Sequence, residues 1–316
     1  MARSLVLRAL AACALGVVGV AAFQQPVFRG GGDIVRVFAT VTDHDGRLAT
    51  NLAQDDFEVR DDGKPQPITV FDNTPQPIRL IVMFDCSGSM HGNLALLRGA
   101  SEQLIPRLRP DDAARIGTFG VDINISPEFT RDTRELEQAI PVSIPEDAPT
   151  PLWRALDQAI DVFPKERQER AVILVLSDGK DAPAPSFRGP FMSQAQVIDR
   201  ARDESVMIYA VGMRSRSAHP MQPGFGPGGL MAAMVADLPD PGLAKVAEQS
   251  GGGYTEIRYG EDLGAAFAQV ADELHSQYLL GYVPPKRDGK AHKIDVKIKP
   301  HGFDARARKN YLAPKG

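Results

Sequence analysis

The chain has 316 residues, of which 43% are hydrophobic and 24% charged, and its formal net charge at pH 7 is −4. This length allows one large or two ordinary domains, and the composition is that of a globular protein rather than a disordered one. The last 31 residues, 286–316, carry a net charge of +7, whereas residues 23–285 carry −13, and such an acidic body argues against a nucleic-acid-binding protein.

Residues 1–22 have the layout of a secretory signal. Two arginines precede an uncharged apolar run that ends in the small residues Val20-Ala21-Ala22, which suit a signal peptidase. The run of about 14 residues is short for a membrane span, which needs roughly 20. We therefore expect an exported protein, periplasmic or secreted, with no stable membrane span after cleavage. The alternatives are a membrane anchor formed by an uncleaved segment and, ranked lower, a lipoprotein cleaved before Cys13.

The cysteine and histidine content argues against an internal disulfide and against a zinc site. Only Cys86 remains after such a cleavage, so no internal disulfide can form. None of the six histidines pairs with another at metal-ligand spacing, which argues against a zinc site.

Residues 33–75 are predicted to form short strands, because apolar residues alternate with polar ones in DIVRVFATVT. The segment FEVRDDGKPQPITVFD is typical of a hairpin that turns at Asp62-Gly63. The same alternation returns near the end of the chain in HKIDVKIK. Since two strands alone are marginally stable in water, we expect residues 33–75 and 277–313 to combine into one small, sandwich-like all-β domain.

Between these segments the pattern changes to buried strands that alternate with helices. RLIVMF at 79–84 is a continuous apolar run, as in a strand of a parallel sheet that is covered on both faces. We expect residues 78–275 to form a doubly wound, mostly parallel α/β sheet flanked by helices, inserted in the β domain. The expected elements and loops are strands at 115–119, 171–177, 206–211 and 253–257, helices along 94–104, 152–163 and 263–274, and long loops at 182–192 and 214–241.

Three groups of oxygen-bearing residues follow or flank these strands: Asp85-Cys86-Ser87-Gly88-Ser89, Thr150 before a predicted helix, and Asp178 after a buried strand. In open α/β sheets, ligands bind at the carboxyl ends of the strands where the strand order reverses. Carboxylates and hydroxyls are hard oxygen donors that suit Mg²⁺ or Mn²⁺ rather than zinc.

The Asp-x-Ser-x-Ser element, with its distant Thr and Asp, resembles the von Willebrand factor type A family. The resemblance implies a metal-ion-dependent adhesion site formed by Asp85, Ser87, Ser89, Thr150 and Asp178. In that family Ser and Thr hydroxyls bind the metal directly or through water, the Asp residues act mostly through water, and one coordination position is left for a partner's carboxylate. The family commonly has Gly-Gly before its Thr, where this chain has Asp147-Ala148-Pro149.

The flanking segments resemble a bacterial subgroup of von Willebrand factor A-related proteins that is known largely from acidobacterial genomes. The similar segments are VTDHDGRLATNLAQDDFEVRDDGKPQPI, SQYLLGYVPP, DGKAHKIDVKIK and ARARKNYLAP. Together with the central segment, this resemblance covers roughly residues 33–313.

The expected function is therefore a non-enzymatic interaction or adhesion module that binds the acidic side chain of a partner protein through Mg²⁺ or Mn²⁺. One alternative is a Mg²⁺-dependent hydrolase, but Ser87 stands where a phosphotransferase with an Asp nucleophile typically has its general acid. Another is a structural or assembly protein with a vestigial site. Taken singly, Ser87, Ser89 and Thr150 could also be helix caps, and Asp178-Gly179 an ordinary turn.

Overall fold

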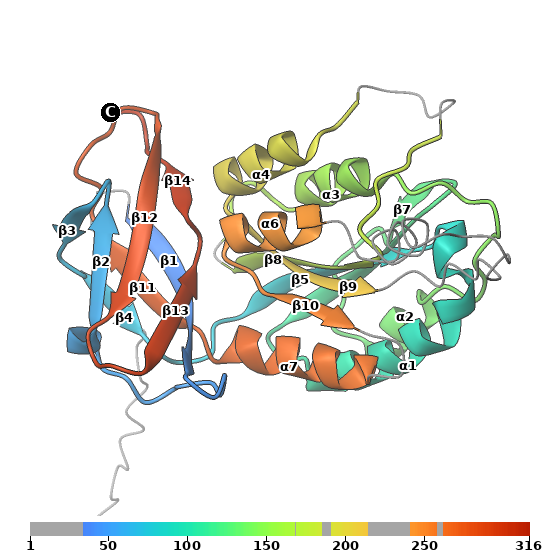
Figure 1. Ribbon diagram of the computed structural model, residues 1–316, viewed down its shortest axis with the longest axis horizontal. Coiled ribbons are helices and arrows are strands. Elements are labelled where there is room, and N and C mark those ends of the chain that lie inside the picture. The colour runs from blue at the N-terminus through green and yellow to red at the C-terminus, as the bar shows by residue number, and fades with distance from the viewer. Residues whose placement is uncertain (1–33, 168, 185–190, 214–240, 258–261) are drawn as a thin grey trace, which may run out of the picture. The chain divides into compact units, whose positions relative to one another are not determined.

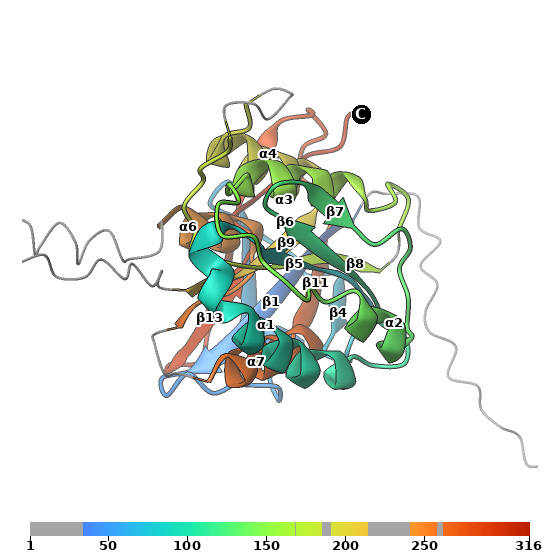
Figure 2. The same ribbon diagram turned by 90° about the vertical axis from the view of Figure 1, so that its right-hand side faces the viewer.

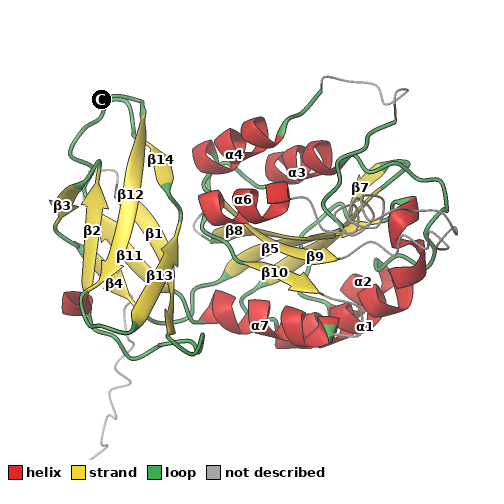
Figure 3. Cartoon of the chain, viewed as in Figure 1, coloured by secondary structure: helices red, strands yellow, loops and turns green. Residues whose placement is uncertain are grey.

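The computed structural model describes residues 34–316, apart from 168, 185–190, 214–240 and 258–261. Strands of this part of the chain form one six-stranded sheet, which helices flank, and two four-stranded sheets (Figures 1 and 3). The described residues include no helix that is long and apolar enough to cross a membrane.

The six-stranded sheet has the strand order β10-β9-β8-β5-β6-β7. All neighbouring strands are parallel except β7, which pairs with β6 in the antiparallel direction. Because the chain passes from β5 to β6 on one side and later to β8 on the other, the strand order reverses at β5. The strands are β5 (Ile78–Asp85), β6 (Ala113–Phe119), β7 (Ile123–Ile125), β8 (Arg170–Ser177), β9 (Val206–Met213) and β10 (Tyr254–Ile257).

Helices cover both faces of this sheet, as the two perpendicular views show (Figures 1 and 2). One face carries α1 (Leu94–Leu104), α2 (Thr133–Gln138) and α7 (Leu263–His275). The other carries α3 (Leu152–Asp161), α4 (Gln194–Asp203) and α6 (Pro241–Ser250).

The apolar run of β5 is continuous because its side chains fill two cores. Successive residues of a strand point to opposite faces. Leu80 and Phe84 therefore belong to the cluster that contains residues of α1 and α7. Ile81 and Met83 belong to the cluster that contains residues of α3, α4 and α6. All four side chains are fully buried, and each such burial contributes roughly 1.5–3 kcal/mol relative to exposure.

The two four-stranded sheets have the orders β13-β1-β11-β4 and β14-β12-β2-β3. Each contains strands from both ends of the chain, and one apolar cluster joins residues of both sheets. The strands are β1 (Val35–Asp43), β2 (Phe57–Asp61), β3 (Lys64–Gln66), β4 (Val70–Asp72), β11 (Tyr278–Tyr282), β12 (Ala291–Ile298), β13 (Phe303–Ala307) and β14 (Asn310–Leu312).

The predicted fold class is confirmed: a doubly wound, mostly parallel α/β sheet lies between chain segments that form additional β sheets. The hairpin turns at Asp62-Gly63 as predicted, and both residues have positive φ, at 46° and 79°. Its second strand is shorter than FEVRDDGKPQPITVFD suggested: β3 ends at Gln66, and β4 joins the other sheet. Pro67 explains the break, because proline has no N–H to donate to a ladder.

Residues 33–316 cluster into one compact unit, so the domain limits drawn at 33–75, 78–275 and 277–313 stay a prediction. The predicted signal at 1–22 and most of the predicted loops at 182–192 and 214–241 lie outside the described residues.

Candidate metal site

Asp85 is the last residue of β5, and its carboxylate is fully buried at the carboxyl edge of the central sheet. Its Oδ1 accepts a hydrogen bond from the backbone N–H of Ser87 at 2.8 Å. Its Oδ2 accepts one from Oγ of Ser177, the last residue of β8, at 2.5 Å. The neighbouring strands β5 and β8 thus fix the orientation of this carboxylate.

The two serines of the motif lie side by side. Oγ of Ser87 is 3.0 Å from Oγ of Ser89. Ser87 is buried and Ser89 is exposed, so the pair extends from the interior toward the surface. Ser87 precedes a 3-10 turn at Gly88–Asn93, but its side chain makes no capping hydrogen bond. Helix capping therefore does not account for Ser87.

The loop before α3 lies directly on the motif. The N–H of Gly88 donates to the carbonyl of Ala148 at 3.0 Å. A Cβ atom on Gly88 would lie 1.9 Å from the carbonyl oxygen of Glu146, so only glycine fits this close approach. The loop in which this chain has Asp147-Ala148-Pro149 thus still contacts the serine-bearing turn.

Thr150 and Asp178 belong to two loops that are paired with each other. Thr150 and Ala182 form an isolated antiparallel bridge, with backbone hydrogen bonds of 2.9 and 2.8 Å. Asp178 follows β8 directly, and its Oδ1 accepts from the N–H of Lys180 at 3.3 Å, within a turn in which Gly179 has a φ of 81°. Asp178 therefore forms the expected turn, which does not prevent it from acting at the site as well. Pro151, not Thr150, occupies the cap position of α3, so capping does not account for Thr150 either.

The structure brings the predicted residues together to different degrees. Asp85, Ser87 and Ser89 are linked by the hydrogen bonds above. Asp178 is buried and close enough for its charge to act on Asp85. Thr150 is buried beside the motif through its loop, and no hydrogen bond from its side chain to the other four is recorded among the described residues.

Sequence reasoning missed Ser177, which orients Asp85. The signal was the polar residue that directly precedes Asp178 at the end of an otherwise apolar strand.

The electrostatics of this edge favour a cation. Burial raises the pKa of Asp85 to about 7, and the nearby carboxylate of Asp178 adds to the rise, although hydrogen bonds from Ser177 and Ser87 oppose it. Among the residues that the structure describes, no Lys, Arg or His forms an ion pair with Asp85 or Asp178. Two buried carboxylates without a counter-charge, beside three hydroxyls, fit a hard divalent cation such as Mg²⁺.

Cys86 lies in the motif but belongs to the apolar cluster under α1 and α7. Burial, with a smaller effect of Asp85, raises the pKa of its thiol to about 12. The thiol therefore stays protonated at neutral pH and packs as a small apolar group.

A second group of ligand-type side chains, Asp61, Asp62 and His292, lies in the β sheets. His292 bonds Oδ1 of Asp61 through Nδ1 at 2.9 Å and Oδ1 of Asp288 through Nε2 at 3.1 Å. Because both imidazole nitrogens already have carboxylate partners, this arrangement is a hydrogen-bonded ion-pair cluster rather than a preformed metal site.

Residues 80–180 match the family model for the von Willebrand factor type A domain. That segment runs from β5 to just beyond Asp178, so it contains the whole candidate site. No curated protein matches the chain significantly.

Solved structures resemble the fold at low sequence identity. A von Willebrand factor type A protein from Catenulispora acidiphila is 14% identical, with a TM-score of 0.50, and the match covers 91% of this chain and 76% of that one. An aerotolerance-related membrane protein from Bacteroides fragilis is 15% identical, with a TM-score of 0.44, and the match covers 62% and 98% of the two chains. The proximal thread matrix protein 1 of the mussel byssus, solved with a zinc-occupied metal-ion-dependent adhesion site, is 18% identical, with a TM-score of 0.48 and coverage of 69% and 50%. At these identities the likeness to the Catenulispora protein establishes a von Willebrand factor type A-like fold and nothing about function.

Proposed function

We propose that this protein is an exported, non-enzymatic interaction module that binds a partner's acidic side chain through a divalent cation, Mg²⁺ or Mn²⁺. Asp85, Ser87, Ser89, Thr150 and Asp178 would hold the cation at the carboxyl edge of the central sheet. When bound, the cation supplies a Lewis-acidic position that a carboxylate of a partner protein completes.

The observation that carries the proposal is the buried pair of carboxylates without a cationic partner. Isolated buried charges are costly, and two of like sign repel each other. Asp85 is fully buried, and Asp178 is 2% exposed. The hydroxyls of Ser87 and Ser89 lie next to Asp85, and the exposure of Ser89 leaves a path from the surface to the site.

Thermal unfolding with and without metal tests this site. A cation that binds only the folded form raises its stability by mass action, so Mg²⁺ or Mn²⁺ should raise the melting temperature progressively with concentration. Asp85→Ala should abolish this response, although without metal the variant need not be less stable, because it also removes one repelling charge. Asp122→Ala, which removes an exposed carboxylate just after β6, is the matched control and should keep the response. An unchanged response in Asp85→Ala would exclude the site.

Partner binding tests the function itself. A protein captured from an envelope extract in Mg²⁺ should be released by chelator and should not bind Asp85→Ala. If capture persisted in chelator, the cation would not mediate partner binding and could have only a structural role. Failure of the wild-type protein to bind metal would favour a structural protein with a vestigial site, whereas Mg²⁺-dependent turnover of phosphate esters would favour a hydrolase.

Export is part of the same proposal, and it depends on the charged, apolar and small-residue order of residues 1–22. N-terminal sequencing of the mature protein should give a start near Phe23. A start at Met1, or a lipid on Cys13, would contradict cleavage at that point.

A further inference from the structure

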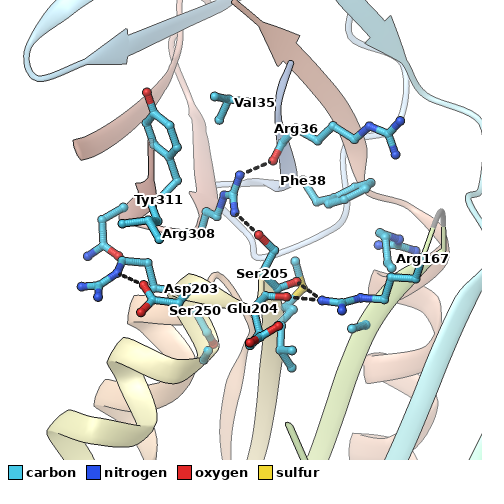
Figure 4. Close-up of a pocket in the computed structure, with 18 of the residues that line it drawn as sticks. Val35, Arg36, Phe38, Arg167, Asp203, Glu204, Ser205, Ser250, Arg308 and Tyr311 are labelled. Atoms are coloured by element: carbon cyan, nitrogen blue, oxygen red, sulfur yellow. Dashed lines mark hydrogen bonds and ion pairs between the residues drawn. The ribbon is translucent and has the colours of Figure 1, made fainter. Parts of the chain in front are cut away.

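A cavity of about 430 Å³ opens at the amino-terminal ends of β8 and β9, opposite the edge that holds the candidate metal site. Its other wall is formed by the start of β1 and the segment around β14 (Figure 4). Arg170 at one end of β8 and Asp178 just beyond the other are eight residues apart, which is about 26 Å along a strand. A ligand in this cavity would therefore not touch the metal site.

The cavity is lined by six cationic side chains and only three carboxylates. All three carboxylates already have cationic partners: Glu169 with Arg79 at 2.7 Å, Asp203 with Arg202 at 2.8 Å, and Glu204 with Lys165 at 3.9 Å. For the other four cations of the lining, no ion pair is recorded within the described ranges. They are Arg36, Arg167, Arg170 and Arg308.

Arg308 lies between the backbone of Arg36 and Ser205 (Figure 4). Its guanidinium donates to the carbonyl of Arg36 at 2.6 Å and to Oγ of Ser205 at 3.1 Å. Both acceptors are neutral, and Nε of Arg308 has no partner. Burial lowers the pKa of Arg308 to about 10, against smaller and opposite effects of Tyr282 and Tyr311.

Arg170 and Arg167 repeat this pattern. Arg170 is 6% exposed, donates to Oε1 of Gln277 and to two backbone carbonyls, and has an unpartnered Nε. Its guanidinium carbon also lies 4.8 Å from the centre of the Phe38 ring. Arg167 donates only to backbone carbonyls, among them those of Pro164 and Glu204. The hydrogen-bond acceptors of both guanidinium groups are neutral, although Glu204 and Asp112 lie close enough for their charges to act on Arg167 and Arg170, respectively.

The turn between α4 and β9 holds these acceptors in place. Ser205 adopts a φ of 51°, the left-handed region that residues other than glycine rarely occupy. In this conformation its hydroxyl faces Arg308, and its carbonyl lies 3.5 Å from Arg167. The strained turn therefore brings two guanidinium groups from distant segments to one short stretch of backbone.

From these contacts we infer that the cavity binds a small molecule through an oxyanion, a carboxylate, phosphate or sulfate group that forms an ion pair with Arg308 and Arg167. Planar guanidinium groups match the oxygen geometry of such anions and bind them in pairs of parallel hydrogen bonds. The half-buried position of Arg308 leaves it accessible from the cavity. The volume suits a small ligand rather than a protein segment.

Equilibrium dialysis of the full chain with labelled inorganic phosphate tests this inference in the presence of chelator. We expect saturable binding of one phosphate per chain, at least tenfold weaker in Arg308→Gln and in Arg167→Gln. Lys309→Gln, which removes a neighbouring charge outside the cavity lining, should bind like the wild type. Asp85→Ala should also bind like the wild type, so failure of the metal site would not affect the result.

Displacement of the bound phosphate by sulfate or by citrate, measured at equal ionic strength, identifies the preferred oxyanion. Thermal unfolding should show a rise of about 3 °C at ten times the dissociation constant of the preferred anion. Because sulfate and phosphate also stabilise proteins non-specifically, only a rise that Arg308→Gln or Arg167→Gln removes supports the site. Non-saturable binding of all three anions would overturn the inference. Equal phosphate binding by the wild type and Arg167→Gln would also overturn it. If Arg308→Gln does not fold, the result for Arg167→Gln decides.

Discussion

Oγ of Ser177 donates a hydrogen bond to Oδ2 of Asp85, so the last residues of two adjacent parallel strands meet inside the protein. The carboxylate is held from both sides, because its other oxygen accepts from the backbone of Ser87. A rigid carboxylate places little entropic cost on cation binding, since its geometry is set before the ligand arrives.

Ser177→Ala should therefore weaken Mg²⁺ binding and also destabilise the fold. Loss of a hydrogen bond to a buried charged group costs about 1–3 kcal/mol. Urea unfolding in chelator measures the stability, and the Mg²⁺-dependent rise in melting temperature measures the site. Ser250→Ala is the control, because Ser250 is also buried and hydrogen-bonded but lies near the amino end of β9, so it should lose stability without changing the metal response. Equal metal responses in the two variants would contradict the role of Ser177.

Gly88→Ala should disrupt the site through the backbone. The new Cβ would overlap the Glu146 carbonyl, so the turn or the loop must move, at a cost of about 1–3 kcal/mol, and the metal response should weaken. Gly99→Ala is the matched control, because Gly99 is exposed in α1 and a Cβ there meets no atom within 4 Å. It should stabilise the protein by about 0.8–1 kcal/mol. If both variants gave the same change in unfolding free energy, the close packing at Gly88 would have no consequence.

Asp112 should make stability fall at low pH. Burial raises the pKa of this carboxyl, but hydrogen bonds from His275 and from the N–H groups of Arg109 and Ile78 outweigh burial and hold the pKa below its usual value. A lowered folded-state pKa means that the stabilisation is present above the unfolded pKa, about 4, and is lost as pH falls through the folded value. Asp112→Asn should cost about 1.5–3 kcal/mol at pH 7. Urea unfolding should show a smaller difference in unfolding free energy between the wild type and Asp112→Asn at pH 3 than at pH 7. An equal difference at both pH values would argue against this role of Asp112.

His292 should produce the opposite trend. Burial lowers its pKa, but bonds to Asp61 and Asp288 outweigh burial and raise the pKa above 6.5. The stabilisation from the protonated ring is therefore complete below about pH 6.5 and is lost as pH rises through the folded-state value. His292→Asn should flatten the decline in stability between pH 6 and pH 9, whereas substitution of the exposed His301 should leave it unchanged. If stability fell equally between pH 6 and pH 9 in the wild type and in His292→Asn, another group would be responsible for the decline.

The strands in which apolar and polar residues alternate could be predicted from the sequence. The alternation along β1 places Val35, Val37 and Ala39 in one core, while on the opposite face Phe38 packs against the core of the α/β sheet and Thr40 is buried. The elements β7, α2, α4 and α6 were missed. Three and six residues in β7 and α2 contain too few repeats of a period to stand out, and α4 buries only Val197 and Ala201.

The candidate site was predictable only as far as its residues are close in sequence or follow a strand. The motif from Asp85 to Ser89 is local, whereas the contact between Gly88 and the loop at Ala148 depends on how two loops fold together. The cationic cavity could not be predicted at all, since Arg167 and Arg308 come from segments more than 100 residues apart in sequence.

The insertion of the α/β sheet between two halves of the β sheets has a mechanical consequence. Tension applied between residues 34 and 316 acts first on β1 and β14, which are both hydrogen-bonded within the β sheets. The chain enters β5 through Gln76 and leaves α7 through Gln277, and Arg170 binds both residues. Tension on these ends therefore reaches the β ladders before it reaches β5, which ends at Asp85, and β8, which Asp178 follows.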